Sequence, residues 1–293
     1  MIQCTKALFI RATRRYSAAA TIIAAQDLAG ISKSKHAIKP LTYPTFGSVE
    51  EERQHRKERM AAAFRVFAKR GYDEGVAGHI SVRDPEDPSR FWLNPLAQHF
   101  STIKASDLIL VDETGEILEG DRPVNRAAFQ IHGAIHKHHS HVTAICHTHS
   151  KHARAFSAFG KELKMYNQDC CRFYKSHGVY RQFGGVVFTE EEGVNISKSL
   201  GQQNKILILQ NHGIVSVGKS VDEAAFWFMT FEDLCETQLQ IEQSRRAGFE
   251  PIEIGNKEAE YTHESIGSSF KGWLNFQGYY DEILKMTKGD FLK

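Results

Sequence analysis

Three histidines stand where two short apolar segments end. His147 and His149 follow the segment 142–146, and His212 follows the segment 206–209. Because side chains repeat every two residues in a strand, His147 and His149 should point the same way. If both strands end on the same edge of one sheet, His212 completes a set of three imidazoles. Such a set suits zinc, iron, copper or nickel better than magnesium or calcium, and it leaves a coordination position open for catalysis.

The other histidines invite simpler interpretations. The run of histidines within residues 136–141 lies at the end of a predicted helix, and we expect it to cap that helix and to be solvated. His132 and His136 have the i,i+4 spacing of zincin ligands, but the glutamate of the H-E-x-x-H motif is absent. We therefore interpret these two as packing groups or as supports behind the metal ligands.

Hydrophobic periodicity predicts alternating strands and helices, which indicates an α/β fold with a mixed sheet covered by helices. The predicted helices cover residues 50–70, 126–138, 151–159, 190–200 and 220–247. The predicted strands cover residues 80–83, 91–93, 108–111, 142–146, 206–209 and 214–217. The periodicity of residues 251–293 is weak, so this C-terminal extension receives no assignment.

Composition excludes several classes of protein. The 293 residues are 41% hydrophobic and 25% charged, with a formal net charge of +2, which gives no reason to expect nucleic acid as a partner. No apolar run approaches the roughly 18–20 residues of a membrane span. The five cysteines are odd in number and form no C-x-x-C pair, which favours reduced thiols over a disulfide framework.

The N-terminal segment resembles a targeting sequence. Residues 1–26 contain no acidic residue but carry Lys6, Arg11, Arg14 and Arg15 among serines and alanines. This composition is typical of a mitochondrial transit peptide, and the alternative is a disordered basic tail on a cytoplasmic protein. Residues 27–47 are predicted to be a linker, and residues 48–250 the folded domain.

Five segments together resemble the class II aldolase/adducin family, in particular its adducin-related branch in fungi and bacteria. They are GVAGHISVR (75–83), SDLILVD (106–112), VTAICHTHS (142–150), LQNHG (209–213) and DEAA (222–225). The resemblance implies a three-layer α/β/α fold with a central mixed sheet and a divalent metal held by His147, His149 and His212. It also implies a small-molecule substrate and a homo-oligomer, with a tetramer favoured.

Two departures from the family affect the expected chemistry. Aldolases of this family carry an acid/base glutamate on the helix before the H-x-H strand, and an ungapped count places Ala128 there. Their phosphate loop reads Gly-Asn-x-Ser, whereas this chain has a histidine at the second position, and Arg126 and Ala127 replace the usual paired serines. The substrate-binding candidates are Gly78, His79, Ser81 and Arg126. The candidates for a replacement acid/base are Glu192, His132, Asp169 and Tyr166.

Three functions remain open at this stage. The first is a metal-dependent, aldolase-like lyase for a small hydroxy-carbonyl or keto acid substrate without phosphate, with zinc as the first choice of metal. The second is a non-heme iron(II) oxygenase or decarboxylase on the same scaffold. The third is a non-catalytic, adducin-like module. Actin or spectrin binding is not expected, because Lys285, Lys288 and Lys293 are scattered and form no basic cluster.

Overall fold

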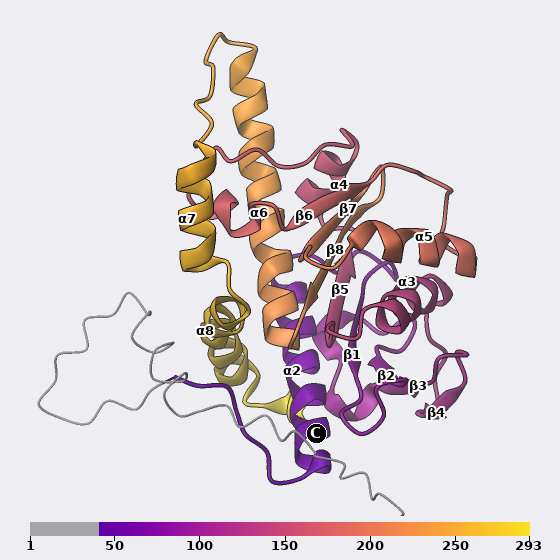
Figure 1. Cartoon of the computed structure of the whole chain (residues 1–293). Coiled ribbons are helices and arrows are strands. Elements are labelled where there is room, and N and C mark those ends of the chain that lie inside the picture. Colours follow the sequence, from indigo (N-terminus) through magenta and orange to yellow (C-terminus); the bar gives the residue numbers. More distant parts are fainter. Residues whose placement is uncertain (1–40) are drawn as a thin grey trace, which may run out of the picture. The chain divides into compact units, whose positions relative to one another are not determined.

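Eight strands form one mixed sheet in the order β4-β3-β2-β1-β5-β8-β7-β6 (Figure 1). Neighbouring strands run antiparallel, except that β6 and β7 are parallel. The strands are β1 His79–Arg83, β2 Phe91–Leu93, β3 Ile109–Val111, β4 Ile117–Glu119, β5 Ala144–Thr148, β6 His177–Tyr180, β7 Ile206–Leu209 and β8 Gly213–Gly218.

The computed structural model describes residues 41–293, and residues 45–293 form one compact unit. The predicted transit peptide and residues 27–40 of the predicted linker lie outside the described residues. The helices are α2 Val49–Lys69, α3 Arg126–His138, α4 Lys151–Ser157, α5 Glu190–Leu200, α6 Val221–Arg245, α7 Asn256–Ile266 and α8 Ser269–Thr287. Short 3-10 helices cover Phe100–Thr102, Ala105–Asp107, Asp169–Phe173 and Asp290–Leu292. None of the described helices is long and apolar enough to cross a membrane.

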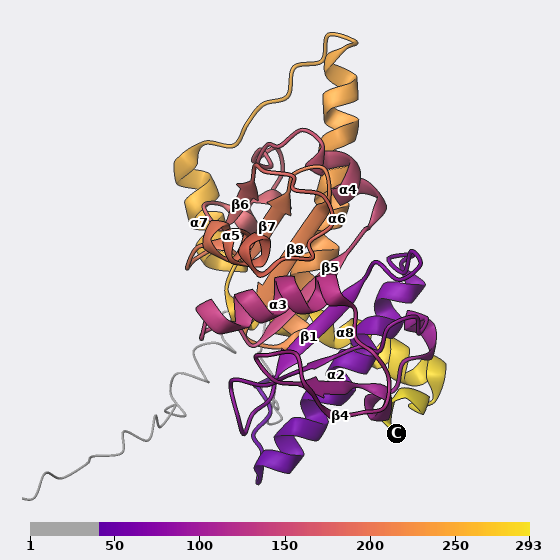
Figure 2. The ribbon, with the colours of Figure 1, turned by 90° about the vertical axis from the view of Figure 1, so that its right-hand side faces the viewer.

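Alternation along the strands separates two hydrophobic clusters. In β7, Ile206 and Ile208 face the larger cluster, whereas Leu207 and Leu209 face a smaller one. The larger cluster contains side chains of α2, α6 and α8, and the smaller one contains side chains of α3 and α5. Figure 2 views the sheet from the side of α3 and α5. The chain is therefore layered helix–sheet–helix, which confirms the predicted fold class.

The predicted helix starts are explained by capping. The Ser48 hydroxyl accepts a hydrogen bond from the amide of Glu51 at the start of α2. The Glu51 carboxylate in turn accepts from the amide of Gly47, at 2.7 Å. Thr189 and Ser220 cap α5 and α6 in the same way. Each cap satisfies an amide that would otherwise lack a partner in the first turn.

The C-terminal residues, which the sequence left unassigned, complete the larger cluster. Phe276 on α8 is fully buried, and Phe291 is buried beyond the end of that helix. The guanidinium of Arg59 on α2 stacks on the ring of Tyr280, 3.5 Å from its centroid. Residues 251–293 thus contribute to the same core as the helices before them.

Candidate metal centre

The sheet topology brings three imidazoles together. His147 lies in β5, His149 follows the end of that strand, and His212 occupies the turn between β7 and β8. Because β5 pairs antiparallel with β8, with Thr148 opposite Ile214, the end of one strand lies beside the start of the other. The candidate ligand atoms of the three histidines all lie within 4.8 Å of one another. We call these residues the histidine triad.

The β7–β8 turn depends on unusual backbone geometry. Asn211 has a φ of 59°, in the left-handed region that asparagine tolerates better than most residues. Gly213 has a φ of 156°, and a β-carbon there would lie 3.3 Å from the carbonyl oxygen of Thr148. The glycine therefore allows the turn to approach β5 closely enough for His212 to join the triad.

The electrostatic environment keeps the triad neutral. His147 is 1% exposed, and its Nδ1 lies 2.8 Å from the carbonyl oxygen of Ile214. A carbonyl only accepts, so Nδ1 carries the proton and Nε2 keeps its lone pair. Burial lowers the pKa of His147 well below its usual range, and burial together with His149 lowers the pKa of His212 to about 4. Neutral imidazoles are the form that binds a transition metal, so this donor set fits zinc or iron(II).

A buried chain of hydrogen bonds adjoins the triad. The His79 ring lies 4.8 Å from the His147 ring, centroid to centroid, because the two residues are opposite each other in β1 and β5. The Nδ1 of His79 lies 2.7 Å from the Nε2 of His132 on α3. The Ser81 hydroxyl then bridges His132 and His136, at 2.7 and 2.8 Å. This chain, His79–His132–Ser81–His136, fixes the His79 ring beside the triad.

One prediction about the other histidines is wrong. The run of residues 136–141 was expected to be solvated, but His136 and His139 are 4% and 3% exposed. The last turn of α3 packs against both β1 and the neighbouring helix α5, so His136 reaches Ser81, and His139 bonds to the carbonyl oxygen of Ser197 at 2.9 Å. Of the histidines in this run, only His138 and His141 are exposed as expected.

The family profile described as "Class II Aldolase and Adducin N-terminal domain" matches residues 58–239. The chain belongs to the class II aldolase/adducin family. Its resemblance to this family is thereby confirmed, and the matched region contains the whole histidine triad and every strand of the sheet.

Members of the class II aldolase/adducin family similar to this chain carry names from different reaction classes. Decarboxylase NovR from Streptomyces niveus is 41% identical over 82% of this chain and 88% of its own length. The 4-hydroxy-3-prenylphenylpyruvate oxygenase/4-hydroxy-3-prenylbenzoate synthase of Streptomyces roseochromogenus subsp. oscitans is 40% identical over 82% and 86%. The solved L-fuculose 1-phosphate aldolase from Glaciozyma antarctica PI12 has a TM-score of 0.78 and 39% identity, covering 86% of this chain and 97% of that one.

The four substrate-binding candidates of this family member lie in different surroundings. The Phe100 ring covers Gly78, where a β-carbon would meet it at 2.5 Å. Ser81 is fully buried, and its hydroxyl is engaged by two imidazoles, so it supports His79 from behind. Arg126, at the start of α3, is exposed, and its guanidinium stacks on the Phe188 ring at 5.7 Å.

The acid/base candidates are dispersed. His132 contacts His79 and thus adjoins the triad, whereas Ala128 packs in an apolar cluster with Phe91 and Leu93. Asp169 is exposed and pairs with Arg172 at 3.1 Å. Glu192 lies in the first turn of α5, where it interacts with the Tyr180 hydroxyl.

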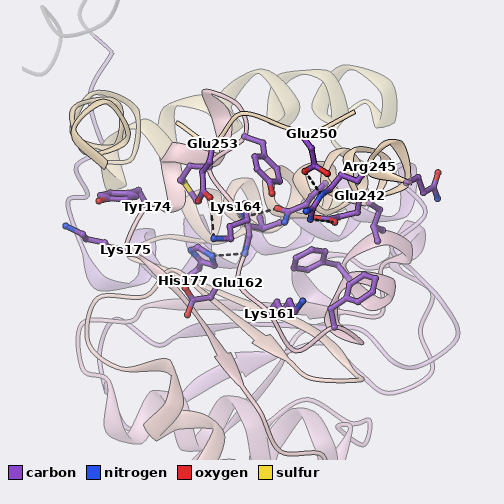
Figure 3. A pocket seen from close by; sticks show the side chains of 18 of the residues that line it. Lys161, Glu162, Lys164, Tyr174, Lys175, His177, Glu242, Arg245, Glu250 and Glu253 are labelled. Atoms are coloured by element: carbon purple, nitrogen blue, oxygen red, sulfur yellow. Dashed lines mark hydrogen bonds and ion pairs between the residues drawn. The ribbon is translucent and has the colours of Figure 1, made fainter. Parts of the chain in front are cut away.

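Tyr166 lines a separate hollow of about 1140 Å³ beside the C-terminal half of α6 (Figure 3). Lys164 and Glu253 form an ion pair there at 3.4 Å, and Arg245 pairs with both Glu242 and Glu250. None of the three triad histidines lines this hollow. The structure therefore does not bring Tyr166 together with the triad.

Sequence reasoning missed one residue that supports the triad. Glu232, in the middle of α6, is 2% exposed and accepts hydrogen bonds from the Ser150 hydroxyl and from the amides of His152 and Ala153. These groups follow His149 directly and start α4. An acidic residue inside the apolar stretch of α6 was the available signal. Such outer partners orient metal ligands.

Proposed function

We propose that this chain is a metal-dependent carbon–carbon lyase that acts on a small hydroxy-carbonyl or keto acid without a phosphate group. The observation that carries the proposal is the histidine triad, whose three ligand atoms lie within 4.8 Å of one another. Membership of the class II aldolase/adducin family and the likeness to a solved aldolase support the lyase class.

In this proposal, different residues bind the metal, orient its ligands and bind the substrate. His147, His149 and His212 would hold a divalent ion, zinc first, and such an ion polarises a substrate carbonyl. His147 is oriented by the Ile214 carbonyl, and Glu232 anchors the chain directly after His149. The Nδ1 of His79 is hydrogen-bonded to His132, so the Nε2 of His79 is the atom that would hydrogen-bond a substrate oxygen.

Elemental analysis beside a cleavage assay tests the proposal. We expect about one divalent ion per chain in the native protein, and a His149→Ala variant that binds the ion at least ~10³-fold more weakly, about 4 kcal/mol. Cleavage of unphosphorylated hydroxy-keto acids should fall in parallel. The matched control is His138→Ala, because His138 is exposed and its Nδ1 lies 2.8 Å from the carbonyl oxygen of Ala134 in its own helix. Native protein that carries no metal and co-sediments with actin filaments would replace the lyase by the adducin-like module.

A second candidate is oxidative decarboxylation of a keto acid with iron(II) in the same triad. Two observations favour it: an alanine, Ala128, stands where the sequence count places the family's acid/base, and two relatives are named decarboxylase and oxygenase. An oxygen electrode separates the candidates. Oxygen uptake that requires iron(II) and a keto acid supports the second, whereas cleavage under argon with zinc supports the first.

We also propose a homo-oligomer and mitochondrial import, as the sequence suggested. Light scattering on the purified chain measures the assembly, with a tetramer expected. A fluorescent fusion of the full chain should enter mitochondria, and one that lacks residues 1–26 should remain in the cytoplasm. An identical distribution of the two fusions would remove the import proposal without touching the enzymatic one.

A further inference from the structure

The loop of residues 181–188 begins at the same end of the strands as the histidine triad. Tyr180 ends β6 opposite Leu209 of β7, and the Tyr180 carbonyl accepts from the amide of Gln210 at 3.0 Å. His212 follows on that same segment of chain. The loop therefore leaves the sheet beside the turn that carries one member of the triad.

This loop exposes apolar side chains that a folded domain normally buries. Phe183, Val186 and Phe188 are 56%, 67% and 48% exposed, while Val187 between them is buried and anchors the loop in the α3/α5 layer. Val76, in the segment before β1, is 54% exposed. We call these four exposed residues the apolar rim: Val76, Phe183, Val186 and Phe188. Exposed apolar patches of this kind mark binding surfaces more often than chance.

The start of α3 joins the two parts of the rim. Asn125, the cap of α3, donates from Nδ2 to the Val76 carbonyl at 3.1 Å, and the next residue, Arg126, stacks on Phe188. The pairs His132–His79 and His136–Ser81 show that α3 and β1 run in the same direction. At about 1.5 Å per residue, Arg126 thus projects about 9 Å beyond His79, past the triad edge of the sheet.

Arg126 is the group on the rim that suits an anion. Its guanidinium is exposed, and among the described residues it forms no ion pair. A guanidinium presents a planar fork of donors that matches a carboxylate. Stacking on Phe188 holds the fork at the rim.

The nearby donors that a phosphate would need are already engaged. Asn125 Oδ1 accepts from the amides of Ala127 and Ala128, so the first amides of α3 are capped from within. The Ser81 hydroxyl is enclosed between His132 and His136. A phosphate at a helix start normally uses several free donors together. One guanidinium beside apolar side chains fits a carboxylate attached to an apolar group instead.

We propose that Arg126 and the apolar rim select an aryl-substituted keto or hydroxy acid, with the carboxylate on Arg126 and the aryl group against Phe183 and Val186. This inference rests on the proposed function, because it names the substrate class of the same site. The loop of the rim leaves the sheet beside the turn that carries His212. The carbonyl of a substrate held at the rim, which lies between its carboxylate and its aryl group, would therefore face the histidines.

Binding of two probes to the full chain reconstituted with Zn²⁺ tests the inference. Phenylpyruvate and pyruvate share the keto acid and differ in the aryl group. We expect titration calorimetry to give a dissociation constant at least tenfold lower for phenylpyruvate. Arg126→Ala should weaken both probes about tenfold, and Arg126→Lys should recover part of that loss. Phe183→Ala should weaken phenylpyruvate by about tenfold and leave pyruvate unchanged.

Two variants serve as matched controls. Phe159→Ala removes a phenylalanine that is 54% exposed in the other hollow, and Arg122→Ala removes an exposed arginine outside the rim. Both should bind the probes as the native chain does. Circular dichroism of every variant verifies folding.

Three results would overturn the inference: equal affinity for the two probes, tighter binding of inorganic phosphate than of pyruvate, or an unchanged preference in Phe183→Ala. If Phe183→Ala instead changes the molar mass in light scattering and keeps the preference, the rim is a contact between copies of this chain. Failure of the proposed function looks different, because phenylpyruvate would then bind with the expected preference while no unphosphorylated hydroxy-keto acid is cleaved.

Discussion

The two faces of the sheet are built from different chemistry. On the α2/α6/α8 face, aromatic rings pack closely: Phe67 and Phe228 are tilted by 37° and Phe173 and Phe231 lie edge to face, both with centroids 5.1 Å apart. On the α3/α5 face, the hydrophobic clusters are smaller, with fewer aromatic rings, and are interrupted by the buried hydrogen-bonded chain from His79 to His136. The first face buries large apolar surfaces, and the second buries polar groups that must each find a partner.

This difference shows which face of the sheet carries the free-energy cost of buried polar groups. The α3/α5 face leaves the Nδ1 atoms of His136 and His139 buried without a hydrogen-bond partner. Each such group costs about 1–3 kcal/mol. The aromatic face offers the apolar burial that offsets such costs. We infer that stability comes mainly from one face and chemistry from the other, and three substitutions probe that division.

The largest effect is expected for Phe276→Ala on the aromatic face. Phe276 of α8 is fully buried, so the truncation removes apolar contacts and leaves a cavity. The free energy of unfolding should fall by about 3–5 kcal/mol. Denaturant titration measures it, and Phe249→Ala is the control, because that ring is 72% exposed and should change little. Metal content per folded chain should stay the same. A loss of metal in the folded variant would show that the faces are not independent.

A smaller effect is expected for Asp84→Asn, also on the aromatic face. Burial raises the pKa of Asp84, but hydrogen bonds from Arg53, Trp92 and the backbone outweigh it and lower the pKa to about 2. The variant should lose about 2 kcal/mol at neutral pH. Glu86→Gln is the control, because Glu86 contacts the same Arg53 but is 63% exposed.

The same carboxylate predicts a pH dependence. Its pKa is lower in the folded chain than in the unfolded one, so its contribution is present above about pH 4 and is lost as the pH falls toward 2. Native protein should therefore lose stability across this window more steeply than Asp84→Asn. Parallel acid limbs in thermal melts would contradict the assignment.

The smallest effect is expected for Ser81→Ala on the histidine face. The substitution removes the hydroxyl that bridges His132 and His136. Both imidazoles are buried, so they cannot hydrogen-bond to water in its place. The free energy of unfolding should fall by about 1–2 kcal/mol. Phenylpyruvate should also bind more weakly, because His132, which holds the His79 ring, loses its own hydrogen-bond partner. Ser101→Ala is the matched control: it breaks a 2.7 Å bond to His99, but in an exposed pair. Equal losses of stability in the two variants would mean that burial does not strengthen the hydrogen bonds of Ser81.

The sequence predicted the fold well where apolar runs and caps were strong. The helices at 126–138 and 190–200 and the strand at 206–209 have the bounds that were expected. The strand β6 was missed because His177 and Gly178 interrupt its apolar pattern, and it is recognised only by pairing with β7. Likewise α8 was left open, because its packing partners on α2 and α6 lie far away in the sequence.

The candidate site was less accessible to sequence reasoning. The spacing of His147 and His149 indicated a common direction, and the structure places His212 beside them. That these residues hold a metal stays a prediction. The burial of His136 and the support from Glu232 depend on how α3 and α6 lie against the sheet, which no local pattern records.

The placement of His212 in a hairpin turn has a consequence for the dynamics of the sheet. An ion held by the triad would link the turn of the β7–β8 hairpin to the end of β5, and would thus constrain three adjacent strands at one end. Amide exchange should then slow in these strands when Zn²⁺ is added, while β2, β3 and β4 exchange as before. The protein would carry a stiffened half and an unaltered half within one continuous sheet.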